Sequence, residues 1–294
     1  MCLLIALFGV LADTPLMMAA NRDERYDRPT EVITVLRGSW PRVLGGRDAV
    51  AGGTWLAVNE HGVVAGLTNQ PSAAGRDDTR RSRGELPLAF AAHDDAATAV
   101  AKVCADLDPS DYNPCWLLVG DRHALFSVDM TRGHHPLLQQ LPPGTYVLEN
   151  APLPASSAKA RQVTALVAAG IAGAAGVNGG NGDAESSGVN GISGDAGAGQ
   201  ADDALAAVLR DHRPAPEPAG QPGTGAAGRV RPAQMSAACV HTGGYGTRSA
   251  MIVSVGTTGR PLVQVADGPP CQAPFQDVTG LWSGPVTALH TGLA

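Results

Sequence analysis

The chain opens with its longest apolar stretch, which occupies residues 2–8 and ends at Gly9. Its length is that of a strand, and the lack of polar positions predicts burial on both faces. A second apolar segment at 16–21 follows the turn sequence ADTP, and we expect it to pair with the first.

Three further pairs of apolar segments are each joined by a short turn sequence, which is typical of antiparallel hairpins. The predicted pairs are 54–58 with 63–68, 115–119 with 124–128, and 249–255 with 261–266; one more strand is expected at 145–150. Because parallel strands need long crossover connections, this pattern favours antiparallel sheets over a doubly wound parallel sheet.

Apolar residues recur at helical spacing in two regions of the chain. Residues 84–107 predict two helices on either side of HDD at 93–95, and Asp94 or Asp95 is the expected N-cap of the second. Residues 156–170 begin with serine and end at glycine, as a capped helix does. The sum is an α+β fold of helices packed on antiparallel sheets.

The composition changes after Gly170. Ten of the 32 residues from 173 to 204 are glycine, and few large apolar side chains remain to offset the entropy of ordering. We therefore predict one domain over 1–294 with a disordered Gly/Ala/Pro-rich insert at about 171–232, interrupted by a short helix at 202–211.

Composition and charge exclude several classes of protein. The net charge of −6 argues against general nucleic-acid binding, which needs a basic face. No apolar run is long enough for a membrane span. The opening stretch lacks the basic region of a signal peptide, so we expect a cytoplasmic protein.

The five cysteines form no CxxC pair and no His/Cys cluster of zinc spacing. They lie at Cys2, Cys104, Cys115, Cys239 and Cys271. We expect most of them to be buried thiols in a reducing compartment, and we predict neither a metal nor a cofactor.

Cys2 is the first residue that could carry chemistry. Removal of Met1 would leave Cys2 with a nucleophilic thiol and a free α-amine, whose pKa of about 7.7–8.0 suits it to take the thiol proton. The alternative is that Cys2 is only the small second residue of a buried strand, since free cysteine is among the most buried residue types.

The sequence NRDE at 21–24 directly follows the second apolar segment. If the first two strands pair, Arg22 or Asp23 comes near Cys2. The arginine would then favour the thiolate and the carboxylate would orient the ammonium. The alternative is a solvated turn, because the charged run NRDERYDR extends beyond the motif.

Three more polar residues are candidates. Asn69 and Asn150 each end a predicted strand, where a side-chain amide could serve as an oxyanion donor or simply start a turn. Arg248 follows three nearby glycines, which is consistent with an anion-binding loop or with a flexible turn.

Taken together, several segments resemble the NRDE domain family, also called the transport and Golgi organisation protein two family. They are the initial Met-Cys, NRDE, GGRDAVAGGTWLAVNEHGVVAGLTN, SRGEL, YNPCWLLVGD and YGTRSAMIV. The resemblance covers nearly the whole chain apart from about 171–232. It implies an N-terminal-nucleophile hydrolase-like fold, a four-layer αββα sandwich of two antiparallel sheets.

The resemblance also implies roles for the candidate residues. Amidases of that fold with a terminal cysteine would make Cys2 nucleophile and base together. Asp23 would hold the α-amine, and Asn69 or Asn150 would supply the oxyanion donor. Arg248 would support the thiolate or an acidic group.

The chain departs from the pattern in two places. Those amidases carry an arginine three residues before the matching aspartate, where this chain has Ala20 and instead places Arg22 next to the aspartate. Neighbouring strand residues point to opposite faces, so Arg22 need not do the same work. The WPK-like stretch usual in the family is here LPASSAK, which leaves only Lys159 in common.

The expected activity is therefore a cysteine N-terminal-nucleophile amidohydrolase or acyltransferase that acts on a small amide or acyl substrate. The alternative is a non-catalytic protein that binds or traffics acyl-CoA, lipid or haem on the same fold, as members of the family have been linked to these ligands. A third possibility is a structural or interaction protein that only keeps the fold.

Overall fold

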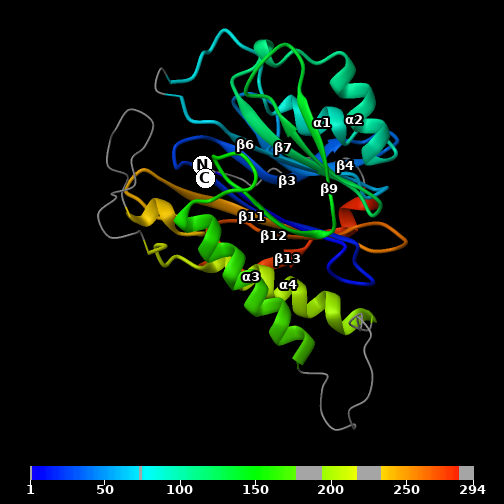
Figure 1. Cartoon of the computed structure of the whole chain (residues 1–294), viewed down its shortest axis with the longest axis vertical. Coiled ribbons are helices and arrows are strands. Elements are labelled where there is room, and N and C mark those ends of the chain that lie inside the picture. Colours follow the sequence, from blue (N-terminus) through cyan, green and yellow to red (C-terminus); the bar gives the residue numbers. More distant parts are fainter. Residues whose placement is uncertain (1, 73–74, 177–193, 217–232, 285–294) are drawn as a thin grey trace.

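The computed structural model describes residues 2–72, 75–176, 194–216 and 233–284, which form two antiparallel sheets packed face to face (Figure 1). The six-stranded sheet has the order β10 (Gly144–Leu148), β1 (Leu3–Phe8), β2 (Leu16–Arg25), β11 (Tyr245–Val255), β12 (Leu262–Ala266) and β13 (Phe275–Asp277). The seven-stranded sheet runs in sequence order: β3 (Thr30–Arg37), β4 (Val43–Asp48), β5 (Leu56–Asn59), β6 (Val64–Asn69), β7 (Cys115–Gly120), β8 (Leu125–Asp129) and β9 (Leu137–Leu141).

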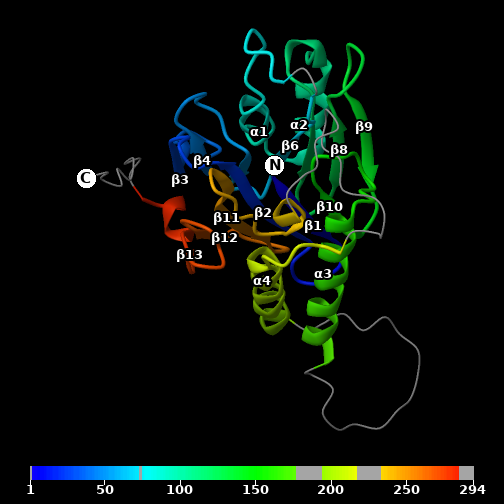
Figure 2. The same cartoon turned by 90° about the vertical axis from the view of Figure 1, so that its left-hand side faces the viewer.

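Helices cover the outer face of each sheet. α1 (Glu85–Phe90) and α2 (Ala96–Ala105) pack on the seven-stranded sheet, and α3 (Ala158–Gly176) and α4 (Gly194–Arg210) pack on the six-stranded sheet (Figures 1 and 2). Three short 3-10 helices lie at Pro109–Asp111, Ala233–Ser236 and Thr279–Trp282. The predicted α+β, four-layer αββα sandwich is confirmed.

Alternation along β1 and β2 divides their side chains between two cores. Leu4, Met18 and Ala20 belong to the core between the sheets, whereas Ile5 and Ala19 face α3 and α4. All six residues of β1 are buried, which confirms the prediction of a strand covered on both faces. This alternation continues into the polar end of β2 and decides where its charged residues point.

The predicted hairpins and helices are present, with ends shifted by a few residues. Asp95 caps α2 as expected, because its side chain accepts a hydrogen bond from the Thr98 amide at 2.7 Å. The second strand is longer than 16–21 and continues to Arg25, because the first half of β11 pairs with its charged end. Strands β3, β4, β9 and β13 were not expected from the sequence.

The prediction of a disordered insert needs correction where the structure describes it. α3 continues to Gly176, and α4 begins at Gly194, eight residues before the short helix predicted at 202–211. α4 is ordered because Ala201, Leu205 and Leu209 share one face and enter the core against the six-stranded sheet. The remaining parts of the insert, 177–193 and 217–232, lie outside the described residues.

A membrane-spanning helix was not expected, and none of the helices in the described ranges has the length and apolar character to cross a bilayer.

Candidate functional site

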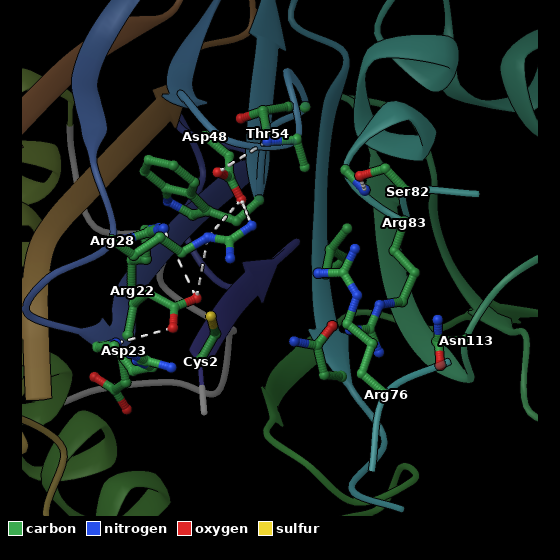
Figure 3. A pocket seen from close by; sticks show the side chains of 18 of the residues that line it. Cys2, Arg22, Asp23, Arg28, Asp48, Thr54, Arg76, Ser82, Arg83 and Asn113 are labelled. Carbon is green, nitrogen blue, oxygen red and sulfur yellow. Dashed lines mark hydrogen bonds and ion pairs between the residues drawn. The ribbon is translucent and has the colours of Figure 1, made fainter. Parts of the chain in front are cut away.

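A cavity of about 440 Å³ opens between the two sheets, at the end where β1 begins and β2 and β6 finish (Figure 3). Four of the candidate residues line it: Cys2, Arg22, Asp23 and Asn69. The rest of the lining comes from residues 24–28, from Asp48 on β4, from the segment before β5, from residues 76–84 and from Asn113. Trp55 and Leu67 are its large apolar members.

Cys2 lies one residue before the pair formed by Leu3 and Asn21, so it continues β1 into the cavity. It has the same parity as Leu4 and therefore faces the space between the sheets. Burial raises the pKa of the Cys2 thiol, and the Asp23 carboxylate adds to this increase. The Arg22 guanidinium and the backbone N–H of Asp23, which hydrogen-bonds to the thiol, act in the opposite direction. The thiol therefore needs a base to reach its reactive form.

Arg22 shares the inter-sheet face with Cys2. It is 3% exposed, and its guanidinium carbon lies 4.5 Å from the centroid of a ring of Trp55, in a cation–π contact. Its nearest carboxylate is Glu24 at 3.9 Å, and its Nη1 has no hydrogen-bond partner among the described residues. Burial lowers the pKa of Arg22, but the neighbouring thiol and acids oppose this change. Arg22 is thus a fixed cation beside the thiol.

Asp23 points to the opposite face of β2, toward α3. Thr247 Oγ1 donates a hydrogen bond to Asp23 Oδ1 at 2.6 Å, and Lys159 Nζ lies 3.8 Å from Oδ2. Burial raises the pKa of Asp23, while Lys159 and the Thr247 hydroxyl favour the carboxylate. Lys159 is itself 4% exposed, so α3 and β11 together hold a buried charged pair directly behind Cys2. The lysine of LPASSAK is thereby placed at the site.

The other two residues of NRDE have different partners. Asn21 is fully buried on the helix side of β2, where its Nδ2 donates to the carbonyl oxygens of Leu209 and Ala238, both at 2.9 Å. Glu24 lines the cavity between Arg22 and Arg28, at 3.9 and 3.8 Å from their guanidinium groups. The segment is therefore a strand end with four separate contacts, and the interpretation as a solvated turn is wrong for 21–23.

The two asparagines occupy different places. Asn69, the last residue of β6, lines the cavity with Cys2. Asn150 lies behind it and donates from Nδ2 to the backbone oxygen of Asn69. Asn150 borders a second hollow with Asp129 and Arg132 instead. Of the two predicted oxyanion donors, Asn69 is therefore the one that shares a cavity with the thiol, and Asn150 positions it.

Arg248 does not reach the cavity lining. Its Nη1 donates to the backbone oxygens of Arg25 and Tyr26, at 2.9 and 2.6 Å, and lies 3.3 Å from that of Arg28. A bulge in β11 between Thr247 and Ser249 turns the side chain toward this loop. Arg248 therefore fixes the chain that leaves β2, which differs from the expected support of a thiolate.

Sequence reasoning missed a group of arginines. Six line the cavity: Arg22, Arg25, Arg28, Arg76, Arg81 and Arg83. Of the three acidic residues in the lining, Glu24 and Asp48 pair with these arginines, whereas the Asp23 carboxylate points behind the cavity to Lys159. The charged run RDDTRRSR at 76–83 was the available signal, but nothing in the pattern indicates that it faces residues 22–28.

The arginines differ in how far they are neutralised. Arg28 binds Asp48 at 2.7 Å, and Arg81 binds Glu85 at 2.7 Å. Arg83, on the side of the cavity opposite Cys2 in Figure 3, has no carboxylate within ion-pair distance in the described part of the chain; its Nη1 donates to the Pro114 oxygen at 3.2 Å. Burial lowers the pKa of Arg83, and the Cys2 thiolate would oppose that. Arg25 and Arg76 pair with Asp27 and Asp78, so Arg83 is the lining arginine without a carboxylate partner in the described ranges.

Comparison with known sequences gives matches along most of the chain. The sequence pattern of the family described as Transport and Golgi organisation 2 matches residues 1–264. A Transport and Golgi organization protein 2 homolog from Bos taurus is 32% identical over 259 residues, which is 83% of this chain and 83% of that one. The homolog from Homo sapiens is 35% identical over 147 residues, 46% of this chain and 50% of its own.

Two solved structures have a related chain path. A mutant of the conjugated bile acid hydrolase from Clostridium perfringens has a TM-score of 0.45 at 11% identity, covering 94% of this chain and 96% of its own. An ortholog of N-acylethanolamine-hydrolyzing acid amidase from Caenorhabditis elegans has a TM-score of 0.40 at 12% identity, over 57% of this chain and 77% of its own.

Proposed function

The chain belongs to the Transport and Golgi organisation 2 family, and from that premise we propose that it is a cysteine N-terminal-nucleophile amidohydrolase or acyltransferase. Its substrate is a small amide or acyl compound, and Cys2 is the nucleophile. The observation that supports this proposal is that Cys2, Asp23 and Asn69 line one cavity, although they come from the starts and ends of three different strands.

The proposed reaction uses the α-amine that Cys2 carries once Met1 is removed. This amine takes the thiol proton, and Sγ bonds to the substrate carbonyl carbon. Asn69 donates to the oxygen that becomes negative, and the backbone N–H of Asp23 stabilises the thiolate before attack. The amine then gives the proton to the leaving nitrogen as the C–N bond breaks. Water or an acceptor hydroxyl or amine removes the acyl group from the thioester and restores the thiol.

Asp23 and Lys159 position this machinery. Arg22 lies beside Cys2 where β1 and β2 pair, and Asp23 is the next residue of β2. The Asp23 carboxylate is therefore available to orient the α-ammonium group of Cys2. Lys159 and Thr247 favour the ionised form of that carboxyl despite its burial. Arg22, fixed over Trp55, lowers the cost of forming the thiolate.

The arginines of the cavity indicate that the substrate carries a negative charge. A cavity lined by six arginines, of which Arg83 has no carboxylate partner in the described part of the chain, suits a ligand with a carboxylate or phosphate. Trp55, just before β5, and Leu67, on β6, provide an apolar surface for an acyl chain in the same cavity as Cys2. The proposed substrate is therefore an acyl amide or acyl ester that carries an anionic group.

A second candidate function is non-catalytic binding of an anionic acyl ligand or of haem. It is favoured by the raised pKa of the Cys2 thiol and by the same arginines, which would hold the phosphates of acyl-CoA or the propionates of haem. Titration with acyl-CoA and haem, comparing Arg22→Ala with the exposed control Arg213→Ala, tests this alternative. Unchanged affinity in Arg22→Ala would argue against it. A cytoplasmic location remains part of both proposals.

The catalytic proposal is tested by trapping its intermediate. The full chain is incubated with a panel of N-acyl amino acids and acyl thioesters, and the protein is digested and weighed. We expect an acyl group on the peptide that contains Cys2, release of the free amine, and loss of both in Cys2→Ala. Turnover that persists in Cys2→Ala would contradict the proposal, and so would acylation confined to other cysteines.

A further inference from the structure

Cys239, His241 and Cys271 meet at one point on the helix side of the six-stranded sheet. Cys239 and His241 precede β11, and Cys271 lies in the turn between β12 and β13. Cys239 Sγ lies 3.5 Å from His241 Nε2 and 3.7 Å from Cys271 Sγ. His241 Nε2 lies 3.0 Å from Cys271 Sγ. Two thiols and one imidazole thus converge from two loops that are distant in sequence.

These separations are those of ligands around one small metal ion. Tetrahedral zinc, with bonds of about 2.3 Å to sulfur and about 2.0–2.1 Å to nitrogen, places two sulfurs about 3.7 Å apart and sulfur and nitrogen about 3.5 Å apart. The triangle with sides of 3.7, 3.5 and 3.0 Å is small enough for one ion to contact all three atoms at those bond lengths. The ion would lie out of the plane of the triangle, which leaves a fourth position.

The chemistry of the donors narrows the choice of metal. Two thiolates and an imidazole select zinc or another soft ion over Mg²⁺ or Ca²⁺, which prefer oxygen ligands. The ring of His212, just after α4, stands edge-on to that of His241 with 6.3 Å between the ring centroids. His212 is exposed and is the neighbouring side chain that could complete a Cys₂His₂ set.

A disulfide is the competing explanation for two close cysteines. The Sγ–Sγ distance of 3.7 Å is well beyond the S–S bond length of about 2.03–2.05 Å, and both residues are free thiols. A disulfide would also leave His241 without a reason to approach both sulfurs. The imidazole at 3.0 Å from one sulfur and 3.5 Å from the other is what a shared cation explains.

We propose that Cys239, His241 and Cys271 bind a structural Zn²⁺ ion. Binding would release the two thiol protons to solvent and leave two thiolates and a neutral imidazole on the metal. The proposal differs from the expectation of no metal site. The sequence did not indicate this site, because Cys271 comes 30 positions after His241, on the far side of the β11–β12 hairpin.

The proposed ion would fix the segment that holds Asp23. Val240, between the two first ligands, donates its N–H to Thr247 Oγ1 at 2.8 Å and accepts from the Thr247 amide at 2.8 Å. Thr247 Oγ1 in turn donates to Asp23. The metal is thus expected to stabilise the hydrogen bonds from Val240 through Thr247 to Asp23, behind the cavity, without contacting a substrate.

The test measures metal in the full chain. Protein purified under reducing conditions without chelator is incubated with Zn²⁺, desalted and analysed by elemental mass spectrometry. We expect about one zinc per chain, retained in the control Cys104→Ser and lost in Cys239→Ser and in Cys271→Ser. Cys104 is a free cysteine packed against the other sheet, so it is a matched control.

A spectroscopic readout keeps the test independent of variant folding. Co²⁺ added to the unsubstituted chain should give thiolate-to-cobalt charge-transfer absorption, which Zn²⁺ then abolishes. Substoichiometric zinc without this absorption would overturn the proposal, as would zinc that survives in Cys271→Ser. A Cys239–Cys271 disulfide in protein handled under reducing conditions would overturn it too. None of these outcomes bears on acylation of Cys2, which tests the proposed function separately.

Discussion

Arg22 and Asp23 are adjacent in sequence but serve different layers of the molecule. The alternation of β2 sends Arg22 into the cavity between the sheets and Asp23 toward α3, where Lys159 and Thr247 receive it. A buried carboxylate is tolerated only when charge and hydrogen bonds compensate its lost hydration. The position of a lysine on α3 is therefore a condition for an ionised Asp23 behind Cys2.

Removing that lysine should destabilise the fold. In Lys159→Met the Asp23 carboxylate stays buried without its cation, and loss of one partner of such a pair costs about 3–5 kcal/mol. We expect a decrease of that size in the free energy of unfolding, measured with urea at neutral pH. The exposed Lys102→Met is the matched control and should change little.

The pH dependence of this loss has a defined sign. Without Lys159 the pKa of Asp23 in the folded state rises further above its unfolded value. Stability is then retained at low pH, where the carboxyl is protonated in both states, and is lost as the pH rises toward the folded pKa. The difference between Lys159→Met and the unsubstituted chain should therefore shrink on acidification. A difference that is independent of pH would contradict a charged Asp23.

At the scale of elements, Asn21 ties β2 to the helix layer. Its side chain donates to the backbone oxygens of Leu209, in the last turn of α4, and of Ala238 in the segment that leads to β11. Loss of the amide would remove this donor from both buried carbonyl oxygens. The first residue of NRDE is thus an attachment for α4, whose second half the sequence predicted as a short helix at 202–211 within the insert.

Asn21→Ala should weaken that attachment. An unsatisfied buried polar group costs about 1–3 kcal/mol, so we expect the free energy of unfolding to fall by about 2–4 kcal/mol. Hydrogen exchange should show faster exchange of α4 amides in the variant. Gln140→Ala, on the exposed strand β9, is the control. Unchanged protection of α4 would contradict the role assigned to Asn21.

The sequence was informative about elements wherever burial repeats with a regular period. β1 and the hairpins β5–β6, β7–β8 and β11–β12 have apolar runs and turn residues that any such sheet requires. β9 was not predicted because it is an edge strand in which Leu137 and Leu138 are exposed. Its residue pattern therefore does not indicate a buried face. α4 begins in glycine-rich sequence, and its order depends on packing against β2 and β11, which the local composition does not contain.

For the whole molecule, the cavity lining is rich in arginine although the chain is acidic. The chain has a net charge of −6, yet its cavity lining contains six arginines and three acidic residues. The candidate residues Cys2, Asp23 and Asn69 could be proposed from strand ends and from the family resemblance. The arginine-rich lining could not, because it forms only when residues 22–28 and 76–83 meet across the two sheets. Charge in the site is therefore a property of the tertiary fold.

Arg83 offers the clearest test of that charge. Replacing it by Gln removes a half-buried guanidinium that has no carboxylate partner in the described ranges. A hydrogen bond to a charged group contributes about 1.5–3 kcal/mol, so binding of an anionic acyl ligand should weaken by about 10- to 100-fold. The control Arg213→Gln should bind normally, and a neutral analogue of the ligand should bind both variants alike. Equal loss for the charged and neutral ligands would contradict anion recognition by Arg83.

Whether Cys2 is a nucleophile activated by its own α-amine is measured most directly by combining the intact mass of the purified chain with rates of iodoacetamide alkylation at each cysteine. We expect Met1 to be absent and Cys2 to react fastest at neutral pH. Burial raises the pKa of Cys104 to about 11 and that of Cys115 to about 12, so these thiols should react slowly. Retention of Met1, or a rate at Cys2 no greater than at Cys104, would contradict this role of Cys2.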